Sequence, residues 1–122
     1  MQYKREEPFR FTFAKPIVGT FFIKKYDGKD IESKPGPLAI IDLSPRGMKL
    51  ITPLDLPVFQ KPIELTVNFS LLDENLAITG LAVWKEKSNH EFLYGIEAFT
   101  DENQQQLLLD TLKQYAKEYR KR

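Results

Sequence analysis

Between residues 63 and 70, apolar and polar side chains alternate without a break. The apolar set is Ile63, Leu65, Val67 and Phe69, and the polar set is Glu64, Thr66, Asn68 and Ser70. A period of two is the signature of a β-strand that buries one face. Shorter apolar runs recur along the chain, separated by proline, glycine, asparagine and aspartate. This pattern predicts a chain built mainly from β-strands.

The remaining strands are placed by the same reasoning. Phe9, Phe11 and Phe13 alternate with polar residues, which predicts a strand that Pro16 should break or confine to a sheet edge. Further strands are expected over residues 17–24, 38–41, 48–52, 76–85 and 91–99. Turns are expected at residues 26–29, 42–47, 73–75 and 88–89, and an irregular loop where two prolines follow residue 52.

The C-terminal segment changes to a helical period. Its apolar stripe consists of Leu108, Leu112, Tyr115 and Tyr119. Thr100 or Asp101 can cap the start of this helix, and Gln104 stands where a capping box requires it. Six or seven short strands before one helix indicate a mostly antiparallel barrel with the helix over one opening. Closing the sheet into a barrel would remove its unpaired edge strands, which would otherwise promote aggregation of so aromatic a sheet.

Composition excludes several classes of protein. A length of 122 residues suits one domain. The absence of cysteine excludes disulfides, zinc ribbons and iron–sulfur clusters, and it is compatible with a reducing cytoplasm. Residues 1–7 lack the apolar core of a signal peptide, and no apolar run approaches the roughly 20 residues of a membrane span. We therefore expect a soluble, cytoplasmic protein.

Nothing in the sequence favours catalysis. His90 is the only histidine and falls in an expected turn, and the sequence has neither a glycine-rich phosphate loop nor a zinc-protease motif. Trp84 is expected in the barrel core rather than beside a ligand. The net charge of +1 predicts no general attraction to polyanions, although basic residues gather near the C-terminus. We expect neither an enzyme nor a resident cofactor or metal.

Residues 42–47, Asp-Leu-Ser-Pro-Arg-Gly, bring together a carboxylate, a hydroxyl and a guanidinium group within one expected turn. Pro45 and Gly47 suit a type I turn, so this segment could be no more than a hairpin connection. If the polar side chains faced outward together, Asp42 could accept hydrogen bonds from a base or orient an arginine. Ser44 could then donate to a base or phosphate, and Gly47 would permit close approach of a ligand.

The second group of polar residues lies near the N-terminus, where Arg5 and Arg10 flank an acidic pair and Lys4 adds a point charge. Arginine can fork onto phosphate oxygens or a guanine edge, and its plane can stack on a base. The alternative is a solvated chain end in which the arginines pair with Glu6 and Glu7. Together with residues 42–47, the arginines would suit a ligand with phosphates and a hydrogen-bonding base.

These two elements resemble those of the PilZ domain, a bacterial receptor module for cyclic di-GMP. Asp42, Ser44 and Gly47 match every defining position of its (Asp/Asn)-x-Ser-x-x-Gly element. Arg10 matches the last arginine of its arginine element and Arg5 the first of a pair. The second arginine of that pair is replaced by Glu6. Residues 80–84, 95–99 and the helix also resemble the later parts of the family.

The resemblance implies a six-stranded antiparallel PilZ-type barrel with a C-terminal helix, in a single domain over residues 1–122. Residues 1–10 would form a flexible ligand-binding arm, 11–99 the barrel and 101–120 the helix. The implied ligand is cyclic di-GMP, often bound as an intercalated dimer. The implied binding residues are Arg5, Arg10, Asp42, Ser44 and Gly47, with Lys4 and Arg46 as weaker candidates.

Three functions stay open at this point. The favoured one is a cytoplasmic bacterial receptor that relays cyclic di-GMP to a protein partner. Glu6 favours a PilZ-like adaptor that works without nucleotide. A barrel that binds single-stranded nucleic acid is the least favoured. The downstream process, the ligand stoichiometry and the oligomeric state do not follow from the sequence.

Overall fold

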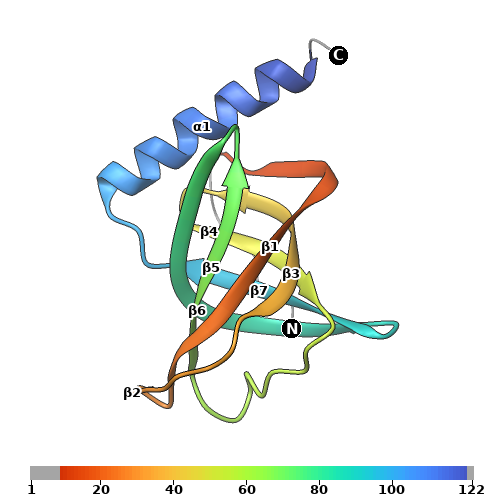
Figure 1. Cartoon of the computed structure of the whole chain (residues 1–122), viewed down its shortest axis with the longest axis vertical. Helices are drawn as coiled ribbons and strands as arrows, with labels where there is room; N and C mark the ends of the chain where they lie inside the picture. Colours follow the sequence, from red (N-terminus) through yellow and green to blue (C-terminus); the bar gives the residue numbers. More distant parts are fainter. Residues whose placement is uncertain (1–8, 121–122) are drawn as a thin grey trace.

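The computed structural model of the chain describes residues 9–120 (Figure 1). The predictions for residues 1–8, which include Lys4, Arg5 and Glu6, lie outside the described residues. The described part contains one helix, α1 (Glu102–Arg120), and these strands: β1 (Phe11–Tyr26), β2 (Lys29–Asp30), β3 (Gly36–Ser44), β4 (Gly47–Thr52), β5 (Ile63–Leu71), β6 (Glu74–Ser88) and β7 (Glu91–Ala98).

The strands close into a barrel. Their order is β2-β1-β3-β4-β7-β6-β5, and β1 also pairs with β5, so the two sides of the sheet meet. Every pairing is antiparallel. The two-residue strand β2 only extends the hairpin that follows β1, which leaves a closed barrel of six strands. This confirms the predicted fold class.

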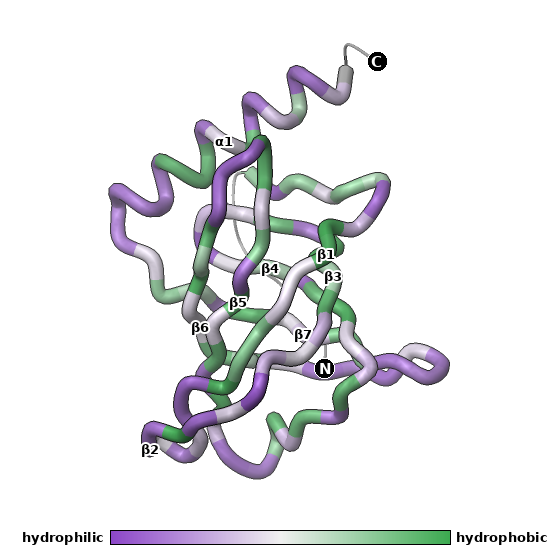
Figure 2. Tube along the Cα trace, in the orientation of Figure 1, coloured by the Kyte–Doolittle hydropathy of each residue, from purple (hydrophilic) through white to green (hydrophobic). Residues whose placement is uncertain are grey.

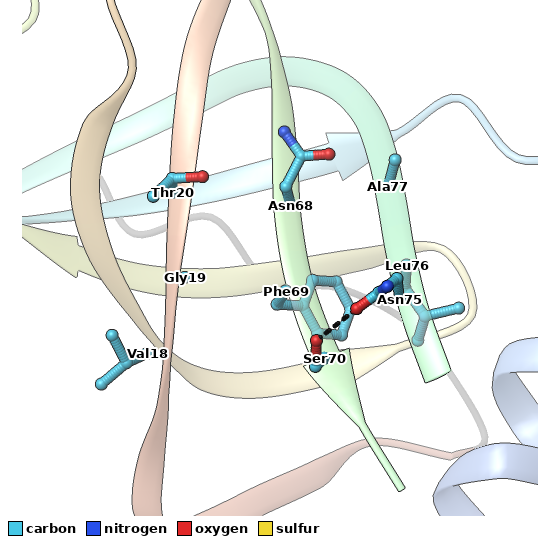
Figure 3. Close-up of a pocket in the computed structure, with 9 residues that line it drawn as sticks. All are labelled: Val18, Gly19, Thr20, Asn68, Phe69, Ser70, Asn75, Leu76 and Ala77. Atoms are coloured by element: carbon cyan, nitrogen blue, oxygen red, sulfur yellow. Dashed lines mark hydrogen bonds between the residues drawn. The ribbon is translucent and has the colours of Figure 1, made fainter. Parts of the chain in front are cut away.

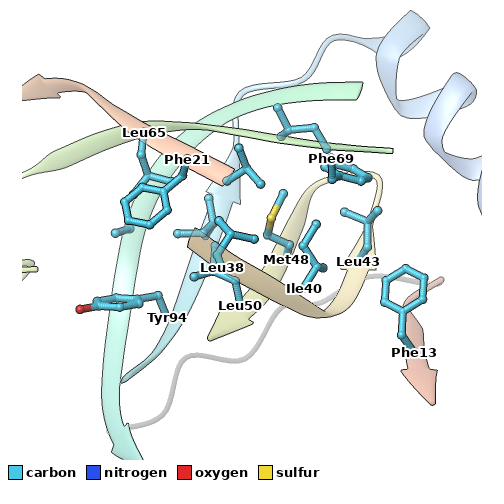
Figure 4. Close-up of a cluster of buried hydrophobic side chains, with 14 of the residues drawn as sticks. Phe13, Phe21, Leu38, Ile40, Leu43, Met48, Leu50, Leu65, Phe69 and Tyr94 are labelled. Carbon is cyan, nitrogen blue, oxygen red and sulfur yellow. The ribbon is translucent and has the colours of Figure 1, made fainter. Parts of the chain in front are cut away.

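The barrel interior is filled by alternate residues of the strands. All four apolar residues of the 63–70 alternation are buried, as their period of two predicted. Figure 4 shows side chains from β1, β3, β4, β5 and β7 meeting there, among them Phe21, Ile40, Met48 and Tyr94. In Figure 2 the hydrophilic residues gather in the connecting hairpins and along one side of the helix.

Strand β1 differs from the expectation that Pro16 would end it. Thr12 pairs with Asp42 and Ile17 with Ile40, so residues 13–16 of β1 lie opposite the single residue Ile41 of β3. Proline is tolerated at such a bulge because no ladder hydrogen bond is required there. The strand therefore continues through Pro16 with a shift of register.

The tight turns follow local chemistry. Asp27 and Gly28 have φ values of 55° and 77°, as expected for an Asp-Gly hairpin, and Asn89 turns the chain between β6 and β7 with φ 57°. The turn expected at residues 73–75 begins one residue earlier and ends two residues earlier. Leu72 and Asp73 make it, with φ values of 51° and 63°, and β6 begins at Glu74.

Helix α1 begins with the predicted capping box. The Gln104 amide donates to Asp101 Oδ1 at 2.8 Å, and the Asp101 amide donates to Gln104 Oε1 at 3.2 Å. The helix crosses one end of the barrel (Figure 1), where Leu108, Leu112 and Tyr115 are buried. Tyr119 was expected on this buried stripe but is 43% exposed. Within residues 9–120, no helix combines the length and apolar character needed to cross a membrane.

Candidate functional site

The Asp42–Gly47 segment forms the hairpin between β3 and β4. Ser44 pairs with Gly47, which leaves Pro45 and Arg46 as the two turn residues. None of these residues has a positive φ, so backbone strain does not require glycine at position 47. The Ser44 hydroxyl donates to the Gly47 carbonyl at 3.1 Å. Because this bond uses the hydroxyl proton, Ser44 is suited to accept from a ligand rather than to donate to it.

Asp42 and Ser44 lie on the outer face of the barrel, because Leu43 between them points into the core. Both are nevertheless buried, with exposed fractions of 6% and 1%. Ligand binding at this turn was predicted on the condition that its polar side chains project outward together. The structure puts them on the expected face but not freely in solvent.

The carbonyl groups of the turn are held by the segment that joins β7 to α1. The Thr100 hydroxyl donates to the Pro45 carbonyl at 2.9 Å, and the Ala98 amide donates to the Arg46 carbonyl at 3.0 Å. The sequence suggested Thr100 only as a helix cap. Its bond to a turn 55 residues away could not be found without the fold.

Arg10 is brought beside this turn by strand pairing. It is exposed and directly precedes β1, in which Phe11 pairs with Leu43. Continued by one residue, this register sets Arg10 opposite Ser44. The side chain of Arg46 is exposed at the tip of the same hairpin. Two distant segments of the sequence, residues 10 and 42–47, are therefore neighbours.

The outer face beside Asp42 continues into an aromatic surface. Asp42 pairs with Lys49, Lys49 with Gly95 and Gly95 with Trp84, so these residues form one row across four strands. Trp84 was expected in the core, but it lies half-buried on this outer row. The Lys49 ammonium lies 5.7 Å from the centre of its ring. Lys49 was not predicted as a site residue, because it belongs to no recognisable motif.

A family model described as "PilZ domain" matches residues 4–117, nearly the whole chain. The chain belongs to the PilZ family. PilZ domains are modules that bind cyclic di-GMP rather than catalysts. A search of curated proteins found no match to the chain. Within residues 9–120, no group of three histidine, cysteine or acidic side chains is placed to hold a metal ion.

Two grooves lie wholly within the part of the chain that the structure describes. One of about 530 Å³ runs over β1, β5 and β6 (Figure 3), where its nine lining residues carry no charge. A second, of about 360 Å³, lies between residues 58–62 and β6. The first groove offers no cationic side chain to the phosphates of a dinucleotide. Neither groove includes a residue of the Asp42–Gly47 turn.

Proposed function

We propose that this PilZ domain is a receptor for cyclic di-GMP, which binds between the N-terminal arginines and the Asp42–Gly47 turn. Binding of the ligand would be relayed to a protein partner, and the ligand would not be chemically changed. The observation that carries the proposal is the strand register that sets Arg10 opposite Ser44. This register supports the proposal because it brings an arginine next to the hairpin that carries Asp42 and Ser44.

The roles of the residues follow from their donors and acceptors. Arg10 and Arg5 would fork onto guanine edges and phosphates. Asp42 would accept from the guanine base and orient an arginine, and Ser44 would accept a hydrogen bond beside it. Gly47 would keep the outer face clear for the ligand. Lys4 and Arg46 would add weaker phosphate contacts.

The outer row of residues extends this site. Trp84 offers a flat ring next to Lys49, three positions along the row from Asp42. A base can stack on an indole, and an ammonium beside it can meet a phosphate. We therefore expect bound nucleotide to reach from the turn toward Trp84. Since cyclic di-GMP is a bacterial second messenger, we expect the receptor to act in a bacterial cytoplasm.

A nucleotide-independent adaptor is the second candidate, and one observation favours it. Phe59 is 75% exposed and lines the 360 Å³ groove together with Leu81 and Val83. An exposed aromatic ring beside an apolar groove is a feature of protein-binding surfaces. Glu6, which replaces an arginine of the family motif, points to the same alternative.

Isothermal titration of the full chain with cyclic di-GMP tests the proposal, with GMP and cyclic di-AMP as controls. Selective binding at micromolar concentrations or tighter supports a receptor. Asp42→Ala, which removes the side-chain acceptor altogether, should then abolish or severely weaken binding while the protein stays folded. The absence of heat and of a thermal shift at high ligand concentration would leave the adaptor as the function.

A further inference from the structure

Helix α1 is attached to both parts of the proposed site, at separate points along its length. One attachment is a chain of hydrogen bonds from the turn to the start of the helix. The other is an aromatic cluster between the second half of the helix and the segment that follows Arg10. In Figure 1 the helix spans the barrel end between these two regions.

The first attachment passes through Thr100. Its hydroxyl donates to the Pro45 carbonyl at 2.9 Å, and its own carbonyl accepts from Gln105 Nε2, in the first turns of α1, at 3.1 Å. The flanking bond from the Ala98 amide to the Arg46 carbonyl holds the same turn. Both turn carbonyls are therefore occupied by the segment from which the helix begins.

The second attachment passes through Tyr115. Its ring meets the rings of Phe11 and Phe13 edge-on, each at a centroid distance of 5.4 Å. Phe11 directly follows Arg10 and pairs with Leu43. Edge-to-face aromatic packing depends on orientation, so a shift of the segment around Arg10 changes the fit of the helix.

We infer that α1 reports occupancy of the site, and that Thr100 is the positioning residue that couples the Asp42–Gly47 turn to it. This inference rests on the proposed function and adds the route by which the signal leaves the site. A ligand that bridges Arg10 and the turn fixes the two attachments relative to each other. The helix between them then has one favoured placement, which a partner can distinguish from the unliganded one.

The coupling can be tested first without nucleotide, by hydrogen exchange of the full chain. Gln105→Ala removes the link between helix and Thr100. Gln106→Ala is the matched control, because Gln106 bonds only Asp110 within the helix, at 2.9 Å. We expect Gln105→Ala, but not Gln106→Ala, to speed exchange across residues 43–50. Equal exchange in the two variants would overturn the coupling.

Thr100 is tested by a pair of conservative changes. Thr100→Val keeps the shape and removes the donor, whereas Thr100→Ser keeps the donor. The Ala98 amide, which donates to Arg46, should exchange faster in Thr100→Val and at the wild-type rate in Thr100→Ser. A purely structural role would lower the melting temperature without this rescue, and the same rate in both variants would contradict the assignment.

The last step adds cyclic di-GMP. Wild-type α1 should gain protection over residues 102–120. Thr100→Val should bind more weakly because the turn is held less firmly before the ligand arrives, by at most about five-fold, the equivalent of one neutral hydrogen bond. Binding to the wild type without any change in α1 would overturn the inference and leave the receptor function intact. If the wild type does not bind, the proposed function fails, and the nucleotide-free measurements still decide the coupling.

Discussion

The indole of Trp84 lies across the backbone of Gly95, so closely that a methyl group on Gly95 would come within 2.0 Å of the indole nitrogen. The two residues are cross-strand partners on β6 and β7. Glycine at position 95 is thus required by the flat placement of the ring on the outer face, beside Lys49. The aromatic surface next to the proposed site depends on this contact.

Gly95→Ala should therefore displace the indole and disturb the surface beside the site. Trp84 is half-buried and can move outward, so we expect a shift in tryptophan fluorescence and weaker nucleotide binding with little loss of stability. Since Trp84 is the only tryptophan, the fluorescence reports this ring alone. An unchanged emission spectrum would contradict the contact.

Gly80→Ala provides the contrasting variant. A methyl group there would meet the Glu97 backbone carbonyl at 2.4 Å, and a backbone within a sheet cannot move aside as a side chain can. We expect a loss of about 1–3 kcal/mol in the free energy of unfolding, as for overpacked cores. Urea denaturation measures this loss directly. If Gly80→Ala were as stable as Gly95→Ala, the difference between a backbone clash and a side-chain clash would be contradicted.

Arg10→Ala should weaken cyclic di-GMP binding by about 1.5–3 kcal/mol, the usual contribution of hydrogen bonds to a charged group. Arg10 is exposed, so the melting temperature of the free protein should stay the same. Lys15→Ala is the matched control, because it removes an exposed positive charge on the β1 bulge, away from the turn. Equal losses in both variants, measured by titration calorimetry, would indicate nonspecific attraction.

Tyr94 predicts a pH dependence of stability at the alkaline end. It is fully buried, its hydroxyl donates to the Leu54 carbonyl at 2.8 Å, and it accepts from the Leu56 amide at 2.7 Å. Burial raises the pKa of Tyr94, which the Leu56 amide and the Lys85 ammonium partly offset. Because the pKa is higher in the folded state than unfolded, this contribution is present below about pH 10 and is lost as the pH rises through the folded-state pKa.

Tyr94→Phe should lower the free energy of unfolding by about 1–3 kcal/mol at neutral pH, because the buried Leu56 amide loses its acceptor. Its stability should also decline less steeply above pH 10 than that of the wild type. Urea denaturation between pH 8 and 11 measures both effects. Tyr26→Phe, which removes a half-buried tyrosine hydroxyl on β1, is the control and should follow the wild type.

Asp101→Ala should destabilise the protein by about 1 kcal/mol through loss of the helix N-cap. Asp110→Ala, on the same helix, removes only a surface contact with Gln106 and should cost about 0.2–0.5 kcal/mol. Thermal or urea unfolding of the two variants compares them. Similar losses would show that the capping box contributes nothing beyond a surface bond.

The elements that the sequence predicted well are those set by local chemistry. The alternation over residues 63–70, the Asp-Gly turn and the Asp101–Gln104 capping box appear where their residues indicated. Periodicity and capping act within a few residues, so one sequence is enough to find them. The motif at residues 42–47 was also located correctly as a hairpin.

The features that the sequence did not predict depend on contacts between distant segments. Trp84 is a large aromatic residue of the kind usually found in a core. Its outward orientation follows from its pairing with Gly95 on the outer row. Thr100 binds a turn that is far away in the sequence. Lys49 becomes a candidate site residue only because it pairs with Asp42 and Gly95. Such relationships arise from strand order and register, which a single sequence leaves undetermined.

The bulge in β1 separates two requirements that a regular strand would tie together. Residues 13–16 span the distance that Ile41 alone covers on β3, and ahead of them Phe11 and Thr12 pair again with Leu43 and Asp42. A change of length at the exposed residues 14–16 would therefore act on the connection between these pairs and the rest of β1, and the Phe11–Leu43 pair would still hold Arg10 next to the turn. The contacts that set Arg10 beside the turn are thus separate from the β1–β5 ladder that closes the barrel.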